Sequence, residues 1–205
     1  MSIRAYGVAL VAAIAVAIGC ESRGTLPASP SASDPGNTLS IASPGGASQF
    51  AEVAEHGKSI TLFDACDPDT FNAPPPAGAG PGTCIRQGGV RFQDFLAQLS
   101  NHHSVGAWHM APGQATIKLG DALEALNRGG ENHTFTEVED FGGGFVQPLN
   151  DLGGFGAQIP ECDPTKVHLL HPGESFHETT DEIGVEKYQC CIHPWMRAEI
   201  HIVQR

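Results

Sequence analysis

One stretch of the sequence, Tyr188-Gln189-Cys190-Cys191-Ile192-His193-Pro194-Trp195-Met196, decides how the chain folds and what chemistry it carries. It places a thiol, an imidazole and a thioether close together. Sulfur ligands select copper(I), zinc or iron–sulfur clusters, and a thiolate combined with imidazoles and a weak thioether suits copper that changes oxidation state. Such a set needs a second histidine from elsewhere in the chain, and His133, after the turn at Gly129-Gly130, is the candidate.

Short apolar runs separated by Gly, Pro and Asn surround this stretch from about residue 107 onward. Alternation in residues 115–119 and 199–203 predicts two strands, and the segment around His168 alternates in the same way. Residues 121–126 favour a helix by propensity, but their neighbours favour a strand. Short strands divided by turn residues predict an all-β sandwich.

The order of the candidate ligands resembles the blue-copper proteins, the cupredoxin or plastocyanin-like family. Cys190-x-x-His193-x-x-Met196, followed by an alternating strand, is similar to the family's C-terminal copper loop, and its spacing is similar to that of the amicyanins. Residues 118–127, followed by 129–134, resemble the family's strand, Gly-Asp, strand, Asn, turn and His. Pro172-Gly173-Glu174-Ser175 resembles its Pro-Gly turn. The resemblance covers residues 107–205, about half of the chain.

This resemblance implies a cupredoxin-like, antiparallel Greek-key β-sandwich with one type 1 copper ion and a role in single-electron transfer rather than an enzymatic one. It implies that His133, Cys190 and His193 form a trigonal plane of ligands and that Met196 is the axial ligand. Thr134 would hydrogen-bond around the ligands. Pro194 and Trp195 would flank an exposed edge of His193 and form an apolar docking patch.

The two adjacent cysteines raise the question of which one is the ligand. Successive residues of a strand face opposite sides, so only one thiol can point at the metal, and Cys190 has the family spacing to His193. Cys191 would then face away. A Cys162–Cys191 disulfide would attach the Gly-rich loop 141–162 to the copper hairpin, with a free or vicinal thiol as the alternative. The four cysteines other than Cys20 and Cys190 allow three pairings.

Residues 50–106 are predicted to form an N-terminal extension that packs on the copper domain at 107–205. It contains a short strand at 59–63 and a loop bounded by Cys66 and Cys84. A disulfide closing that loop removes roughly 3 kcal/mol of unfolded-state entropy. Apolar residues at helical spacing (Phe92, Phe95, Leu96, Leu99) predict one short amphipathic helix at about 90–101.

Residues 1–20 have the pattern of a signal peptide, with Arg4 before an apolar run. The run ends at Ala17-Ile18-Gly19-Cys20, which resembles a bacterial lipobox and predicts lipidation of Cys20. An ordinary signal peptide or an uncleaved anchor is the alternative. Residues 21–49 are rich in Ser, Pro, Gly and Ala and predict a flexible linker. We expect an exported, periplasmic or cell-surface protein, anchored to the membrane by lipid.

The formal net charge of −12 excludes an electrostatic footprint for nucleic acid or anionic lipid. Between Glu131 and Glu186 the only basic residue apart from histidine is Lys166. This acidic bias could steer a basic redox partner such as a c-type cytochrome, or could simply keep the surface soluble. The other histidines predict either a second metal site or ordinary solvated positions; those near the copper domain are His102, His103, His109, His168, His171 and His177.

The sequence therefore leaves three functions to compare. The first is an electron carrier with one type 1 copper ion. The second is a copper-binding or copper-delivery protein with the same ligands and no electron transfer. The third is a zinc site or a redox-active dithiol at Cys190-Cys191, which leaves His133 and Met196 without a role. There is no nucleophilic triad, phosphate loop or functional carboxylate pair, and the chain is too short for the two sandwich domains of a copper nitrite reductase.

Overall fold

A computed structural model describes residues 57–205. The predicted signal peptide, the lipidation site at Cys20 and the linker at 21–49 lie outside the described residues. In the part of the chain that is described, no helix has the length and apolar character needed to cross a membrane.

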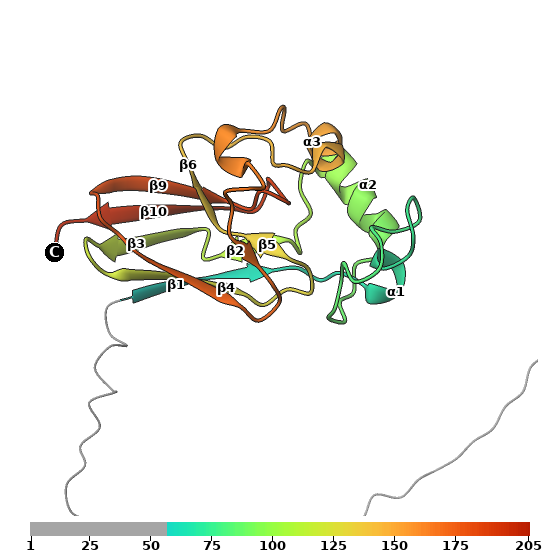
Figure 1. Cartoon of the computed structure of the whole chain (residues 1–205), viewed down its shortest axis with the longest axis horizontal. Coiled ribbons are helices and arrows are strands. Elements are labelled where there is room, and N and C mark those ends of the chain that lie inside the picture. The colour runs from blue at the N-terminus through green and yellow to red at the C-terminus, as the bar shows by residue number, and fades with distance from the viewer. Residues whose placement is uncertain (1–56) are drawn as a thin grey trace, which may run out of the picture. The chain divides into compact units, whose positions relative to one another are not determined.

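Two four-stranded sheets form the described fold, with a two-stranded sheet beside them (Figure 1). The first has the order β2-β1-β4-β8: β1 (Gly57–Phe63), β2 (His109–Ala111), β4 (Ala122–Asn127) and β8 (Ser175–Thr179). The second has the order β3-β10-β9-β6: β3 (Gln114–Lys118), β6 (Thr136–Val138), β9 (Gly184–Gln189) and β10 (Arg197–Val203). The small sheet pairs β5 (His133–Thr134) with β7 (Leu169–Leu170).

The core lies where alternate residues of the strands are buried. Ile60 and Leu62 of β1 and Ile200 and Ile202 of β10 are almost completely buried, while residues between them are more exposed. This period of two is the expected result when one face of each strand packs inward. The sequence therefore predicted the all-β sandwich and the strand character of residues 121–126 correctly.

The sheets are mixed, and this differs from the purely antiparallel sheets that the resemblance implied. β1 pairs with β4 in parallel, and β3 pairs with β10 in parallel. The chain leaves the first sheet after β2, forms β3 in the second sheet, and returns to the first as β4. The consecutive strands β2, β3 and β4 therefore alternate between the two sheets, and no hairpin connects the strands that pair in parallel.

The structure shows no division of the sandwich at residue 107. Strand β1 belongs to the segment predicted as an N-terminal extension, yet it lies between β2 and β4 and pairs with both. The extension thus supplies an inner strand of the first sheet. The rest of this segment follows the end of β1 and includes the helices at Pro68–Phe71 and Phe92–His102.

Three helices gather away from the C-terminus of the sandwich: α1 (Pro68–Phe71), α2 (Phe92–His102) and α3 (Gln147–Gly153) (Figure 1). Helix α2 confirms the amphipathic helix predicted at about 90–101. Helices α1 and α3 were not predicted: the extension was expected to contain a single short helix, and residues 141–162 were expected to form one long loop. Each of these helices begins at residues that favour a helix start: Asp67 caps α1 before Pro68, and a proline occupies the first turn of α3. A 3-10 turn, Pro160–Cys162, follows.

Two disulfides are present, Cys66–Cys84 and Cys162–Cys191. The second attaches the segment after α3 to the residue that follows Cys190. Both pairings agree with those expected from the sequence. Cys190 is the one cysteine within residues 57–205 that is outside a disulfide, and it is completely buried.

Candidate metal centre

Three separate parts of the sandwich bring the metal-site side chains together. His133 lies on β5, Cys190 directly follows β9, and His193 lies in the turn that leads to β10. The turn is closed by two backbone hydrogen bonds: the amide of Cys190 donates to the carbonyl of Met196 at 3.0 Å, and the amide of Met196 donates to the carbonyl of His193 at 2.9 Å. The antiparallel pairing of β9 with β10 and these hydrogen bonds therefore hold Cys190, His193 and Met196 in one tight turn.

The two histidines face the thiol through the same ring nitrogen. Nδ1 of His133 and Nδ1 of His193 each lie 3.7 Å from Sγ of Cys190. The ligand atoms of the three residues all lie within 4.8 Å of one another. All three side chains are buried, and His193 is only 3% exposed. Together they form a compact group of donor atoms away from water.

These separations fit a metal ion. With metal–sulfur and metal–nitrogen bonds of about 2.3 and 2.0 Å and an angle of about 120° between them, the sulfur and nitrogen atoms lie about 3.7 Å apart. One thiolate and two imidazoles form the ligand set that copper and zinc accept. His133, Cys190 and His193 can therefore hold such an ion with little movement.

The surroundings favour the thiolate form of Cys190. Burial alone would raise the pKa of this thiol, but hydrogen bonds and charge interactions with His133 and His193 lower it well below its usual range. For His133, burial opposes the charged form, but its contacts with Asp64 and Cys190 raise its pKa to about 9. A thiolate is the form of cysteine that binds metals.

Thr134 links the two adjacent cysteines, as expected of a residue that hydrogen-bonds around the ligands. Its backbone amide points at Sγ of Cys190 at 3.4 Å, and its hydroxyl oxygen accepts the backbone amide of Cys191 at 2.7 Å. The disulfide directs the Cys191 sulfur toward Cys162. Cys190 is therefore the cysteine that faces the histidines, as predicted.

Met196 is completely buried in the turn that carries His193. Its role as the axial ligand stays a prediction, because the clustered donor group comprises His133, Cys190 and His193.

Among solved structures, the chain is similar to a purple cupredoxin from Nitrosopumilus maritimus, at 22% identity over 48% of this chain and 86% of that one, with a TM-score of 0.34. It is also similar to a Cu(I) form of an amicyanin variant, at 18% identity over 46% of this chain and 73% of that one, with a TM-score of 0.33. A reduced Cu(I) amicyanin at pH 4 gives 18% identity, 49% and 77% coverage, and a TM-score of 0.33. No protein-family model matches the sequence, and no curated protein matches it.

One expectation drawn from the cupredoxin resemblance is wrong: His193 has no exposed edge. Its ring packs against Trp195, with 5.4 Å between ring centroids, and against Phe95 of α2, at 6.4 Å. Pro194 is buried as well, and only Trp195 is partly exposed. The cause is the packing of distant segments on this turn, because Phe95 of α2 and the partly buried Phe155 after α3 bring aromatic rings to Trp195.

Within residues 57–205, the other histidines do not gather into a second metal site. In residues 57–205 the one group of three or more clustered donors is His133, Cys190 and His193. His171 pairs with Asn132, at 2.9 Å, and His103 contacts the carbonyl of Gly153, at 3.1 Å. These contacts are those of ordinary loop and helix-end positions.

Two buried carboxylates beside the histidines were missed by the sequence analysis. Oδ2 of Asp64 lies 2.9 Å from Nε2 of His133, and Oε2 of Glu131 lies 3.6 Å from Nε2 of His193. Glu131 accepts a hydrogen bond from Nε1 of Trp108 at 2.6 Å. Burial raises the pKa of Glu131, whereas for Asp64 hydrogen bonds from His133 and two backbone amides outweigh burial and lower the pKa to about 2.

Proposed function

We propose that this chain is an electron-transfer protein that binds one copper ion at a type 1 site, and not an enzyme. The observation that carries the proposal is the buried group of Cys190 and two histidines, with both sulfur–nitrogen separations at 3.7 Å. When bound, copper supplies a one-electron couple between Cu(I) and Cu(II). The protein's part is to hold its ligands in one arrangement, so that little movement accompanies the electron.

Met196 is proposed as the weak axial ligand. Its burial and the two hydrogen bonds of its turn hold it beside His193 and Cys190. A long thioether contact tunes the potential of such centres without determining whether copper binds. Replacing Met196 with Leu should therefore retain the copper and shift the potential, and an unchanged potential would exclude axial ligation.

Export, lipid attachment at Cys20 and a basic partner such as a c-type cytochrome complete the proposed function. Two disulfides in the described residues support an oxidising compartment, because disulfides are rare in reducing ones. The acidic surface supports a basic partner.

The test is the visible and EPR spectrum of the protein loaded with Cu(II). We expect an intense thiolate-to-copper charge-transfer band and narrow copper hyperfine splitting. Cys190→Ser should abolish the band, whereas Cys20→Ser, which removes the other cysteine outside the two disulfides, should retain it. A colourless wild-type protein would exclude the type 1 site and favour zinc.

The structure weakens the competing functions. A dithiol at Cys190-Cys191 lacks its second thiol, because Cys191 is bonded to Cys162. A delivery protein must release its copper to a partner, but His193 lies behind Phe95 and Trp195. Slow copper exchange with a chelator would support the carrier, and fast exchange would support delivery.

A further inference from the structure

Asp64 contacts the back of a metal-site histidine. It directly follows β1, and its side chain is only 1% exposed. Its Oδ2 lies 2.9 Å from Nε2 of His133, while Nδ1 of the same ring faces Cys190. A neutral imidazole has one N–H donor and one acceptor nitrogen, and a carboxylate only accepts. The contact with Asp64 therefore selects the form of His133 that carries its proton on Nε2.

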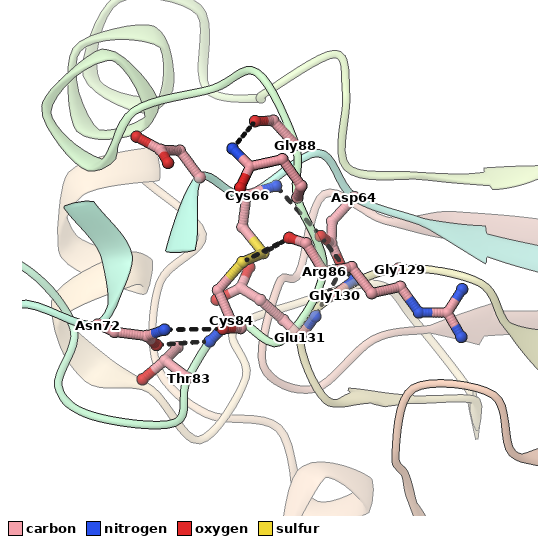
Figure 2. The surroundings of a disulfide bond; sticks show 12 residues. Asp64, Cys66, Asn72, Thr83, Cys84, Arg86, Gly88, Gly129, Gly130 and Glu131 are labelled. Atoms are coloured by element: carbon pink, nitrogen blue, oxygen red, sulfur yellow. Dashed lines mark hydrogen bonds between the residues drawn. A yellow bond between two sulfur atoms is a disulfide. The ribbon is translucent and has the colours of Figure 1, made fainter. Parts of the chain in front are cut away.

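The carboxylate of Asp64 is itself held in place by backbone amides (Figure 2). Gly130 donates to both oxygens at 2.9 and 2.8 Å, Glu131 donates to Oδ2 at 3.0 Å, and Cys66 donates to Oδ1 at 3.2 Å. The turn must approach closely to do so. A Cβ atom on Gly129 would lie 1.9 Å from Oδ2 of Asp64, so any other residue type at this position would displace the carboxylate of Asp64.

The segment after Asp64 secures the same turn from its other side. Cys66 forms a disulfide with Cys84, and the amide of Ile85 donates to the carbonyl of Gly130 at 2.9 Å. Figure 2 shows this disulfide beside Asp64, Gly130 and Glu131. The disulfide-closed segment and the turn that leads to His133 thus hold Asp64 between them.

We propose that Asp64 is a positioning residue of the metal centre: its carboxylate accepts the Nε2–H of His133 and keeps the lone pair of Nδ1 directed at the metal. The N-terminal extension therefore serves the site directly, in addition to supplying a strand. The inference rests on the proposed function only for the identity of the metal, because the same orientation is required for zinc. Partners of this kind fix the ring and increase the basicity of a histidine ligand.

The first experiment uses the unaltered protein loaded with zinc(II), which is diamagnetic. Long-range ¹H–¹⁵N correlation spectra of the histidine rings show which nitrogen carries the proton. We expect His133 to have a slowly exchanging proton on Nε2 and the metal on Nδ1. A proton on Nδ1, or a rapidly exchanging Nε2 proton, would overturn the proposal whether or not copper gives a type 1 spectrum. Conversely, a failed copper spectrum with the expected zinc result would count against the proposed function alone.

The second experiment compares Asp64→Asn with Glu131→Gln as a matched control. Asparagine retains the volume, but its amide nitrogen must face one of the donors that the carboxylate satisfied. Glu131→Gln also removes a buried carboxylate, and the amide oxygen of the glutamine can still accept the hydrogen bond from Nε1 of Trp108. Both variants are checked for folding by circular dichroism and urea unfolding before metal is added.

We expect Asp64→Asn to lower the affinity for zinc(II) by about 10- to 100-fold, the range found when such partners are removed. Glu131→Gln should cost less than tenfold and leave the Nε2 proton of His133 unchanged. With copper, a loss ten times larger for Cu(II) than for Cu(I) would raise the potential of Asp64→Asn by about 59 mV. Equal losses in the two variants would mean that Asp64 acts only as a buried charge, and would overturn the positioning role.

Discussion

The ring of Phe95, on helix α2, lies edge-on to the imidazole of His193, with 6.4 Å between the ring centroids and 84° between the ring planes. Phe95 also packs against Trp108 at 4.8 Å and Trp195 at 5.8 Å. Phe95, Trp108 and Trp195 thus form an aromatic wall that separates this histidine from water.

Removing part of that wall should expose His193. Phe95→Ala should lower the free energy of unfolding by about 3–5 kcal/mol, the usual cost of deleting a buried phenylalanine. It should also increase the relaxation that a soluble paramagnetic probe causes in the His193 signals of the zinc-loaded protein. Leu99→Ala is the control, because Leu99 is equally buried on the same helix. Leu99→Ala should also lower the free energy of unfolding but should leave the relaxation of the His193 signals unchanged. Equal relaxation of these signals in both variants would contradict a specific role of Phe95 in covering His193.

Thr134 should contribute to both stability and spectrum. Thr134→Val keeps the shape but leaves the buried amide of Cys191 without its acceptor, which should cost about 1–3 kcal/mol in urea unfolding. Because the lost hydrogen bond holds the backbone directly after Cys190, the charge-transfer band of the copper form should shift. Thr179→Val, at an exposed position on β8, should stay within about 0.5 kcal/mol of wild type and leave the band in place. An unshifted band in Thr134→Val would mean that the hydroxyl contributes to stability without positioning Cys190.

The Cys162–Cys191 disulfide should stabilise the fold by closing a loop. With the partners 29 positions apart in the sequence, replacing both cysteines with serine should cost roughly 3–4 kcal/mol, measured by urea unfolding of the metal-free protein. Cys66 and Cys84 are 18 positions apart, and replacing both should cost roughly 3 kcal/mol. Of the two double variants, only the one that lacks Cys66–Cys84 should also bind zinc more weakly, because this disulfide helps to hold Asp64 in place. A double variant at 162 and 191 that unfolds like wild type would show that the loop is already ordered in the unfolded chain.

The acidic cluster on β6, β8 and β9 should make stability depend on pH. Burial raises the pKa values of Glu137 and Glu186, and the neighbouring charges of Glu178, Asp181 and Glu182 add to both shifts. These carboxyls bind protons more readily in the folded protein than in the unfolded chain. Their contribution to stability therefore rises as pH falls from neutrality through the raised pKa values.

Neutralising one member of the cluster tests this dependence. Glu182→Gln should increase the free energy of unfolding at pH 7 and flatten its rise between pH 7 and the usual glutamate range. Asp151→Asn, at an exposed aspartate that contributes to neither shift, should leave the slope unchanged. A steeper slope in Glu182→Gln would refute the assignment.

What could be predicted from the sequence depended on local pattern. The spacing of Cys190, His193 and Met196 is set within one turn between paired strands, so it is visible in the chain itself. The strands at 59–63 and 199–203 and helix α2 follow from periods of two and 3.6 residues. Both disulfides could be predicted because cysteines outside the ligand are few.

What the sequence did not reveal depends on contacts between distant segments. Asp64 and Glu131 are two of 23 acidic residues, and nothing in their local surroundings marks them as buried. Their role follows from the packing of the segment after β1 against the Gly129-Gly130 turn. The burial of His193 was missed for the same reason, since the phenylalanine ring that packs against it, Phe95, comes from about 100 positions earlier in the chain.

The adjacency of Cys190 and Cys191 constrains how the protein matures. Of two neighbouring thiols, Cys191 must be oxidised and Cys190 must remain reduced. A nascent chain exposed to oxidant can therefore trap Cys190 in the wrong bridge. A metal ion bound early would occupy that thiolate and leave Cys191 to find Cys162, so that acquisition of the metal and correct oxidation become one coordinated event in the biogenesis of the protein.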